Sequence, residues 1–220
     1  MEPKIFDHNS REYSLTAMGI GENRFNGAYY YSKEIVENII PRIETDRNWV
    51  TINVSGRCYD HSIVFIHNNN LPQKYDWLRN YKDLILVCGV PSTVSKIQER
   101  LPMHHAIYLP LSIDTDYVKK FKKKERRGTC FAGRLDKKTD QIPKNCDILG
   151  NIPREELLEK MSNYYRVYAV GRCAIEAKAL GCKIGIYDPR YPKDIWNIMD
   201  NETAALILQA NLDMIDKKEV

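Results

Sequence analysis

The chain has 220 residues, of which 43% are hydrophobic and 28% charged, and its formal net charge is +4. This composition predicts a globular protein with a substantial buried core, and so mild a basic excess does not by itself indicate a nucleic-acid binder. The opening residues, MEPKIFDHNS, lack the apolar segment of a secretory signal, and no apolar run approaches the about 20 residues of a membrane-spanning helix. The six cysteines are scattered without a C-x-x-C pair, so we expect reduced, structural thiols, no zinc site and a cytoplasmic location.

The first half of the chain predicts strands and helices in alternation. Residues 27–43 carry isoleucines at helical spacing, and Pro41 is expected to end or kink that helix. Four apolar segments predict strands, and they span residues 49–56, 62–69, 83–90 and 105–114. A further helix is predicted at 91–101, where Ser92 or Thr93 is available to cap its amino end.

The same alternation restarts after a basic run in the middle of the chain. Four more segments predict strands, and they span residues 128–134, 146–152, 166–171 and 182–188. Three helices are predicted in this half, at residues 152–164, 172–181 and 201–217. Gly181 is expected to close the second of these helices, because glycine favours the left-handed conformation of a helix end.

Continuous apolar strands that alternate with helices are typical of parallel sheets covered on both faces. We therefore predict an α/β protein of two small Rossmann-like domains, with the final helix as a candidate to pack back on the first domain. The predicted domains are residues 1–118 and 128–220, joined by a basic linker at residues 119–127. A single domain of mixed topology is the alternative.

The basic linker reads KKFKKKERR, with seven cations and one acid. One interpretation is a solvated connector between the domains. The other is a site for an anionic partner, such as a nucleic acid, a phosphorylated ligand or a lipid surface. The sequence leaves both interpretations open.

Two glycine–arginine pairs follow predicted strands in the second half, Gly133-Arg134 after GTCFA and Gly171-Arg172 after RVYAV. Ligands of open parallel sheets bind beyond the carboxyl ends of the strands, where helix amino ends favour phosphate. A glycine lets the backbone approach a ligand closely, and an arginine can hold a phosphate with two parallel hydrogen bonds. Both pairs are therefore candidate phosphate contacts.

Three charged residues lie near these pairs. Lys137 and Lys138 follow the first arginine and would add positive charge. Glu176 lies about one helical turn after Gly171, where a carboxylate can accept both hydroxyls of a ribose. The alternative for Glu176 is a plain surface glutamate on an amphipathic helix whose alanines permit tight packing on a sheet.

The order of these motifs resembles the donor-binding domain of GT-B glycosyltransferases, the nucleotide-sugar enzymes that include the glycogen and sucrose synthases. The matching segments are FAGRLDKK, ILGNIPREELLEKM, RVYAVGR, EAKALG and CKIGIYD, in that order. SIVFIHNN, LILVCGVPSTVSKIQERL and IYLPLSIDTDYVKKF in the first half match more weakly. The resemblance covers residues 62–188 and implies a fold of the GT-B type.

The resemblance also implies roles for the matched positions. Arg134 and Lys138 would hold the donor diphosphate, with Lys137 as the alternate, and Glu176 would bind the ribose. The positions implied to line the base pocket or to face the phosphate or sugar are Gly150, Asn151, Gly171 and Arg172. Such enzymes generally need no metal or other cofactor, because cations and helix ends offset the charge of the leaving diphosphate.

The expected function is transfer of a sugar from a nucleotide diphosphate to an unknown acceptor. An inverting transfer would need a general base. The candidates in the first half are Asp60, His61, His67, His104 and His105, and His67 stands at the carboxyl end of a predicted strand. One alternative is a non-catalytic nucleotide-binding or interaction module derived from the GT-B fold. Tyr168 favours it, because many retaining members carry a second glutamate at that position. Another alternative is a glycosyltransferase that modifies DNA.

Overall fold

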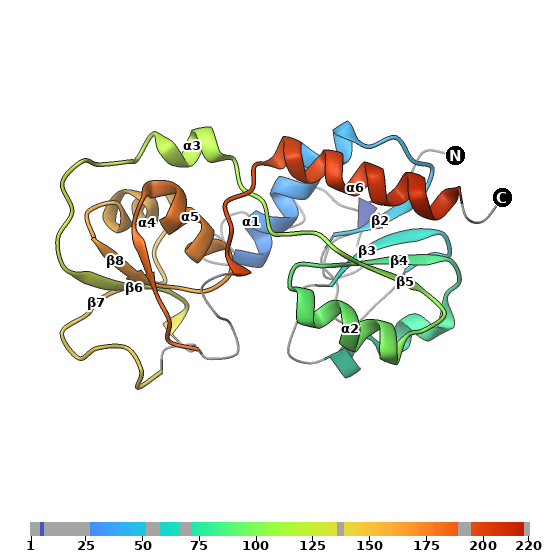
Figure 1. Cartoon of the computed structure of the whole chain (residues 1–220), viewed down its shortest axis with the longest axis horizontal. Helices are drawn as coiled ribbons and strands as arrows, with labels where there is room; N and C mark the ends of the chain where they lie inside the picture. Colours follow the sequence, from blue (N-terminus) through green and yellow to red (C-terminus); the bar gives the residue numbers. More distant parts are fainter. Residues whose placement is uncertain are drawn as a thin grey trace. The chain divides into compact units, whose positions relative to one another are not determined.

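The computed structural model describes residues 5–6, 27–51, 58–66, 72–135, 139–188 and 195–217, and the statements below concern these residues. They form an α/β structure with two sheets, in which every paired strand runs parallel to its neighbour (Figure 1). The chain divides into two compact units. Residues 28–110 and 202–217 belong to the first unit, and residues 111–201 to the second.

The first unit contains a five-stranded sheet with the order β1-β2-β3-β4-β5. Its strands are β1 Ile5–Phe6, β2 Asn48–Val50, β3 Ser62–Ile66, β4 Leu84–Cys88 and β5 His105–Tyr108. Every residue of β3 and of β4 is buried. Their unbroken apolar sequences are therefore those of central strands that are covered on both faces, as predicted.

Helical segments lie on both faces of this sheet (Figure 1). They are α1 Gly27–Glu34, the 3-10 helix η3 Pro72–Asn80, α2 Pro91–Arg100 and α6 Asn201–Asp216. On one face, Val64 and Leu86 pack in a single apolar cluster with Tyr75 of η3 and Ile97 of α2. On the other face, the ring of Tyr31 from α1 meets Phe65 edge-on, with 6.2 Å between ring centroids.

Two prolines mark helix boundaries in this unit: Pro41 lies at the end of one helical segment, and Pro91 starts another. The predicted helix 27–43 is realised as α1, a π-helical turn η1 Ile35–Ile39 and a 3-10 turn η2 Ile40–Arg42, after which the chain is extended. The regular α-helix ends at Glu34, and Pro41 lies in the 3-10 turn that closes the helical segment, because its ring is incompatible with a regular α-helical turn; the expected end or kink at Pro41 is confirmed in this form. The predicted cap of α2 is wrong. Its N-cap is Val90, with no side-chain hydrogen bond, because the helix starts on Pro91, whose fixed φ suits a first turn.

The second unit contains a four-stranded sheet with the order β7-β6-β8-β9. Its strands are β6 Thr129–Gly133, β7 Asp147–Gly150, β8 Arg166–Tyr168 and β9 Lys183–Gly185. Its helices are α3 Thr115–Lys119, α4 Arg154–Met161 and α5 Arg172–Leu180. Gly181 ends α5 in the left-handed conformation, with φ +87°, as predicted.

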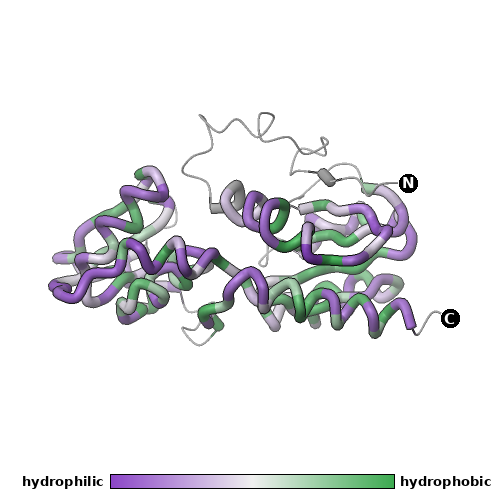
Figure 2. The backbone as a smooth tube through the Cα atoms, turned by 90° about the horizontal axis from the view of Figure 1, so that it is seen from above, coloured by the Kyte–Doolittle hydropathy of each residue, from purple (hydrophilic) through white to green (hydrophobic). Residues whose placement is uncertain are grey.

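The final helix, α6, packs on the first unit, although the second unit lies between them in the sequence. The backbone N–H of Glu44 donates to Gln209 Oε1 at 2.7 Å, and Arg47 Nη2 lies 2.9 Å from Asp216 Oδ1. Hydrophobic and hydrophilic residues interleave along α6 (Figure 2), and the apolar positions Leu208 and Leu212 are buried. The expectation that the final helix packs back on the first domain is confirmed, whereas the predicted domain boundaries had placed all of residues 128–220 in the second domain.

The six cysteines are free thiols, and all but Cys173 are buried. Burial raises the pKa of Cys58 to about 11 and that of Cys88 to about 12, so these thiols are protonated and unreactive near neutral pH. The structural role predicted for the cysteines agrees with this. No helix in the described ranges is both long enough and apolar enough to cross a membrane.

Candidate functional site

Three of the predicted pairs lie at one edge of the second sheet. Gly150 and Gly133 are the last residues of β7 and β6, and Gly171-Arg172 comes shortly after β8; these three strands are neighbours in the sheet. Gly133 is the register partner of Gly150, and Phe131 that of Tyr168. Because the strands are parallel, their carboxyl ends meet at one edge, and the structure brings these pairs together there.

The strand order reverses at this edge. The chain leaves β6 for its neighbour β7 and then crosses back to β8 on the other side of β6. The connections after β6 and β8 therefore leave the sheet in opposite directions. A crevice opens at such a switch point in open α/β sheets, and ligands bind there. Arg134 and Gly171 follow the two strands that flank it.

Gly171 forms the turn that leads from β8 into α5. Its φ is +62° and its ψ −138°, a conformation that is essentially restricted to glycine. A Cβ atom added to Gly171 would meet no heavy atom within 4 Å. Glycine is therefore required by the backbone angle and not by crowding. The space beside it suits a ligand that approaches the main chain.

Gly150 is required for a different reason. A Cβ atom there would lie 3.3 Å from the carbonyl oxygen of Gly133 and would overlap the side chain of Leu135. The next residue, Asn151, is exposed and has φ +56°, a left-handed conformation that asparagine tolerates better than most residues. This corner thus presents a polar side chain directly beside the carboxyl end of β6.

The cations predicted to hold a diphosphate are described only in part. Arg134 directly follows β6 and its side chain is exposed at the sheet edge. Lys137 and Lys138 lie outside the described residues. Arg134 is therefore the one of the three predicted cations that lies within the described residues.

Glu176 is not a surface residue, so that alternative from the sequence is wrong. It is 1% exposed, on the second turn of α5. Its Oε1 accepts hydrogen bonds from Arg172 Nε at 2.8 Å and from Arg154 Nε at 3.0 Å. One buried carboxylate therefore joins the first residue of α4 to the first residue of α5.

Sequence reasoning missed Arg154. Its guanidinium also lies over the ring of Tyr117 from α3, 5.2 Å from the ring centroid, and the Tyr117 hydroxyl donates to Glu155 at 2.7 Å. The first turn of α5 contains no acid and begins with Arg172. Arg172 therefore places a cation at the amino end of α5, a helix end that favours an anion, whereas the first turn of α4 carries Glu155 and Glu156 beside Arg154.

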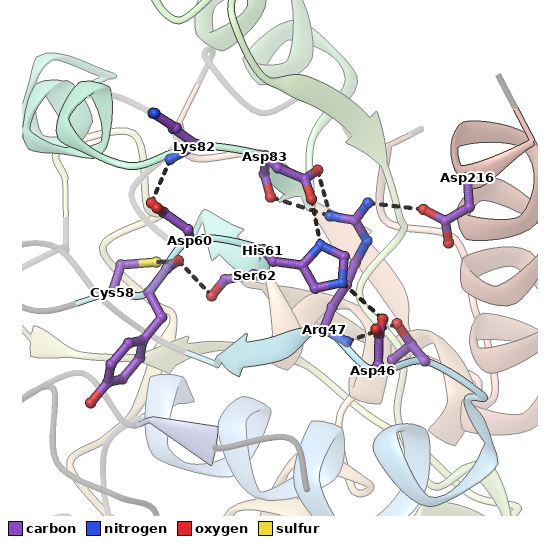
Figure 3. A network of polar contacts seen from close by, with 11 residues as sticks. Asp46, Arg47, Cys58, Asp60, His61, Ser62, Lys82, Asp83 and Asp216 are labelled. Carbon is purple, nitrogen blue, oxygen red and sulfur yellow. Dashed lines mark hydrogen bonds and ion pairs between the residues drawn. The ribbon is translucent and has the colours of Figure 1, made fainter. Parts of the chain in front are cut away.

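The predicted base candidates Asp60 and His61 belong to the sheet of the first unit, where they lie at the amino ends of the strands and not at the carboxyl ends. They precede β3, beside residues that precede β2 and β4, and so stand at the amino ends of the strands (Figure 3). Asp60 Oδ1 accepts the backbone N–H of Lys82 at 2.7 Å. His61 Nε2 bonds Asp46 Oδ1 at 2.8 Å, and its Nδ1 bonds Asp83. Both ring nitrogens of His61 are thus engaged by aspartates.

This network has the features of a structural clamp. Arg47 is 1% exposed and bonds Asp83 at 2.7 Å and Asp216 of α6 at 2.9 Å. Burial opposes protonation of His61, but its hydrogen bonds with Asp83 and Asp46 outweigh burial and raise its pKa. Burial likewise opposes ionisation of Asp83, whose pKa is nevertheless lowered by hydrogen bonds from His61 and Arg47. Charged partners that immediately precede β2, β3 and β4, together with Asp216 of α6, therefore hold one another in place.

The other histidine candidates are placed less favourably for proton transfer from a substrate. His104 is 3% exposed, and its Nε2 lies 3.1 Å from the carbonyl oxygen of Leu78. Burial lowers its pKa. His105 is exposed at the start of β5, again at an amino end. His67 follows β3 in the sequence and lies outside the described residues.

The part of the chain that the structure describes contains no group of three histidine, cysteine or acidic side chains arranged to hold a metal ion. No protein-family model, curated protein or solved structure matches this chain. The resemblance to GT-B glycosyltransferases therefore rests on the sequence motifs, and the α/β architecture with parallel sheets is compatible with it.

Proposed function

We propose that this chain is a glycosyltransferase of the GT-B type that binds a nucleotide diphosphate sugar at the carboxyl edge of its second sheet. One observation carries the proposal. Gly133-Arg134, Gly150-Asn151 and Gly171-Arg172 end three neighbouring parallel strands around a switch point. Amide groups, a helix amino end and arginines at such an edge are suited to a diphosphate.

In this proposal Arg134 contacts the diphosphate from the end of β6, together with Lys137 or Lys138. Gly171 lets the phosphate or sugar approach the amino end of α5. Gly150 and Asn151 line the pocket for the base. No metal is needed for this arrangement, because the positive groups offset the charge that develops on the leaving diphosphate.

Glu176 has a modified role in the proposal. A direct contact with the ribose, which the resemblance implies, would require a carboxylate that is 1% exposed to give up a hydrogen bond from an arginine. We infer that Glu176 first serves to orient Arg154 and Arg172 at the sheet edge. Removing it would then weaken donor binding by disturbing two guanidinium groups and not only by deleting a sugar contact.

A non-catalytic nucleotide-binding module is the second candidate. It is favoured by the state of the described base candidates, because His61 is engaged at both ring nitrogens and Asp60 accepts a backbone N–H. A retaining transfer would not need either residue, and His67 stays a candidate base for an inverting one. Donor binding is common to both candidates, whereas turnover distinguishes them.

The test uses the full chain with a panel of uridine and guanosine diphosphate sugars, each with and without acceptors. Calorimetry measures binding, and chromatography measures released nucleoside diphosphate. We expect binding that Arg134→Ala weakens about tenfold, or about 1.4 kcal/mol. Arg79→Ala, at an exposed arginine of the first unit, is the matched control. Binding without release would favour the module, and equal binding by parent and Arg134→Ala would contradict the site.

A further inference from the structure

The basic run at residues 119–127 is fixed to the second unit. Arg126 Nη1 donates to the carbonyl oxygen of Gly181 at 2.8 Å, and its Nη2 donates to Leu180 at 2.5 Å, so this side chain caps the end of α5. Lys123 Nζ lies 3.0 Å from Asn163 Oδ1, and the backbone N–H of Arg127 donates to Asn163 at 2.9 Å. A plain solvated connector does not explain these contacts.

The fixed run continues into the amino ends of three neighbouring strands. Arg166, at the start of β8, is the register partner of both Thr129 on β6 and Lys183 on β9. Its backbone N–H donates to Gly128, the residue that follows the run. The cations of the run therefore lie beside Arg166 and Lys183, at the sheet edge opposite to the candidate donor site.

Several of these cations are exposed and have no acidic partner. In the described part of the chain, the side chains of Lys122, Lys124, Arg127 and Arg166 form neither a hydrogen bond nor an ion pair. The run contains one acid, Glu125. The dipole of α5 accounts for the position of Arg126, which bonds the last carbonyl oxygens of that helix. It does not account for the exposed cations whose side chains form no hydrogen bond or ion pair. Held together by a fixed backbone, such charges repel one another unless a polyanion joins them.

An aromatic side chain completes this surface. Tyr165 precedes β8, is 47% exposed, and has Lys183 Nζ 4.8 Å from its ring centroid. Exposed aromatic rings among cations bind unpaired bases by stacking, while the cations bind the phosphates. Phe121 of the run is half-buried against Tyr117, with 5.5 Å between ring centroids, so it does not serve as an apolar anchor for a lipid surface. These features favour a nucleic acid over a membrane.

We propose that Lys122, Lys124, Arg127, Arg166, Lys183 and Tyr165 form a surface that binds single-stranded nucleic acid. We call these six residues the basic surface. Its cations contact successive phosphates, and Tyr165 stacks on a base. The proposal is independent of the glycosyltransferase proposal, because the two sites lie at opposite edges of the second sheet and share no residue.

The test measures fluorescence anisotropy of a labelled single strand of about 15 nucleotides, a length near the upper site size of a single-strand binding module. We expect the triple variant K122S/K124S/R127S to bind at least about tenfold more weakly than the parent at low salt. The slope of log affinity against log salt should fall by about 2, since each lost phosphate contact on a single strand contributes about 0.7. The matched control is K74S/K96S/K217S, which removes three exposed lysines of the first unit and should change affinity less than about twofold.

Tyr165→Ala tests the assignment to single strands. We expect it to weaken single-strand binding about fivefold while a duplex of the same sequence is unaffected, and Tyr165→Phe should bind like the parent. Thermal melts check that each variant is folded. No single-strand binding by the parent, equal losses in the two triple variants, or binding to phosphatidylserine-rich vesicles alone would overturn the proposal. An unchanged Tyr165→Ala would overturn its assignment to unpaired bases.

Discussion

At the scale of single residues, the carboxylate of Glu176 connects two helices of the second unit. It is buried and accepts hydrogen bonds from Arg154 and Arg172, which come from different helices. Its position on α5 and its i, i+4 spacing from Arg172 are evident from the sequence, but its second partner, Arg154, is not. Arg154 lies 22 residues earlier, and no periodic pattern connects residues at that separation.

We expect Glu176→Ala to lower the free energy of unfolding of the second unit by about 3 kcal/mol, because two guanidinium groups then lose a buried partner. Urea unfolding measures this loss. Glu156→Ala is the control, since Glu156 pairs with Lys160 on the exposed face of α4 and such pairs contribute little. Equal stability of the parent and Glu176→Ala would show that the two arginines do not depend on this carboxylate.

In the absence of denaturant, Glu176→Ala should also weaken binding of the nucleotide sugar donor more than about tenfold.

His61 should make the stability of the first unit depend on pH. Its pKa is raised in the folded state by Asp83 and Asp46, against the effect of burial. Its contribution is therefore fully present below its ordinary pKa of 6.5 and is lost as the pH rises through the raised value. We expect the stability difference between the parent and His61→Gln to shrink across that window.

The difference is measured by urea unfolding at a series of pH values from about 5 to 9. Burial lowers the pKa of His104, which acts in the opposite direction, but His104 is present in both proteins and cancels in the difference. The pKa values of Asp46 and Asp83 are lowered from 3.8, so their titration lies below the measured range. If the difference in free energy of unfolding stays constant with pH, the protonated His61 forms no stabilising ion pair with Asp46 or Asp83.

At the scale of secondary structure, segments with continuous apolar sequence or clear helical spacing were predictable. The residues of β3, β4, β6 and β7 fall inside the predicted strands, and α2, α4, α5 and α6 inside the predicted helices. The elements that the sequence did not predict are short: β1, η3 and α3. Two to nine residues without clear periodicity carry too little pattern, and tertiary packing decides their conformation.

The end of α5 depends on an arginine from another segment. We expect Arg126→Ala to destabilise the second unit by about 2 kcal/mol, because the carbonyls of Leu180 and Gly181 lose charged hydrogen bonds. Arg127→Ala, one residue later and exposed, should change stability by less than about 0.5 kcal/mol. Thermal and urea unfolding measure both variants. Equal effects would mean that Arg126 does not anchor the basic run.

At the scale of the whole molecule, the return of α6 to the first unit was not readable in detail from the sequence. The amphipathic pattern of α6 shows that one face is buried, but not which sheet it covers. Arg47 and Glu44 supply that information through contacts more than 160 residues apart in the sequence. The switch point in the second sheet could not be predicted either, because it depends on the order of the strands in the sheet. The sequence of a single strand does not indicate which strands lie beside it.

We expect Leu208→Ala, at a fully buried position of α6, to cost about 3 kcal/mol and to act on the first unit. Hydrogen exchange monitored by mass spectrometry should show lost protection in peptides from residues 28–110, with peptides from residues 111–200 unchanged. Leu206→Ala on the same helix is the control, because Leu206 is 68% exposed. Loss of protection in the second unit alone would contradict the grouping of α6 with the first.

We propose that a nucleoside diphosphate binds at the carboxyl ends of the strands of the second sheet. The most direct measurement follows the backbone amide signals of the isotope-labelled full chain during titration with uridine or guanosine diphosphate. We expect the amide signals of Gly133, Gly150 and Gly171 to shift, together with those of their neighbours Arg134, Asn151 and Arg172, while signals from the first unit stay unchanged. Saturating nucleotide that shifts none of these amides, or shifts only signals from the first unit, would contradict it.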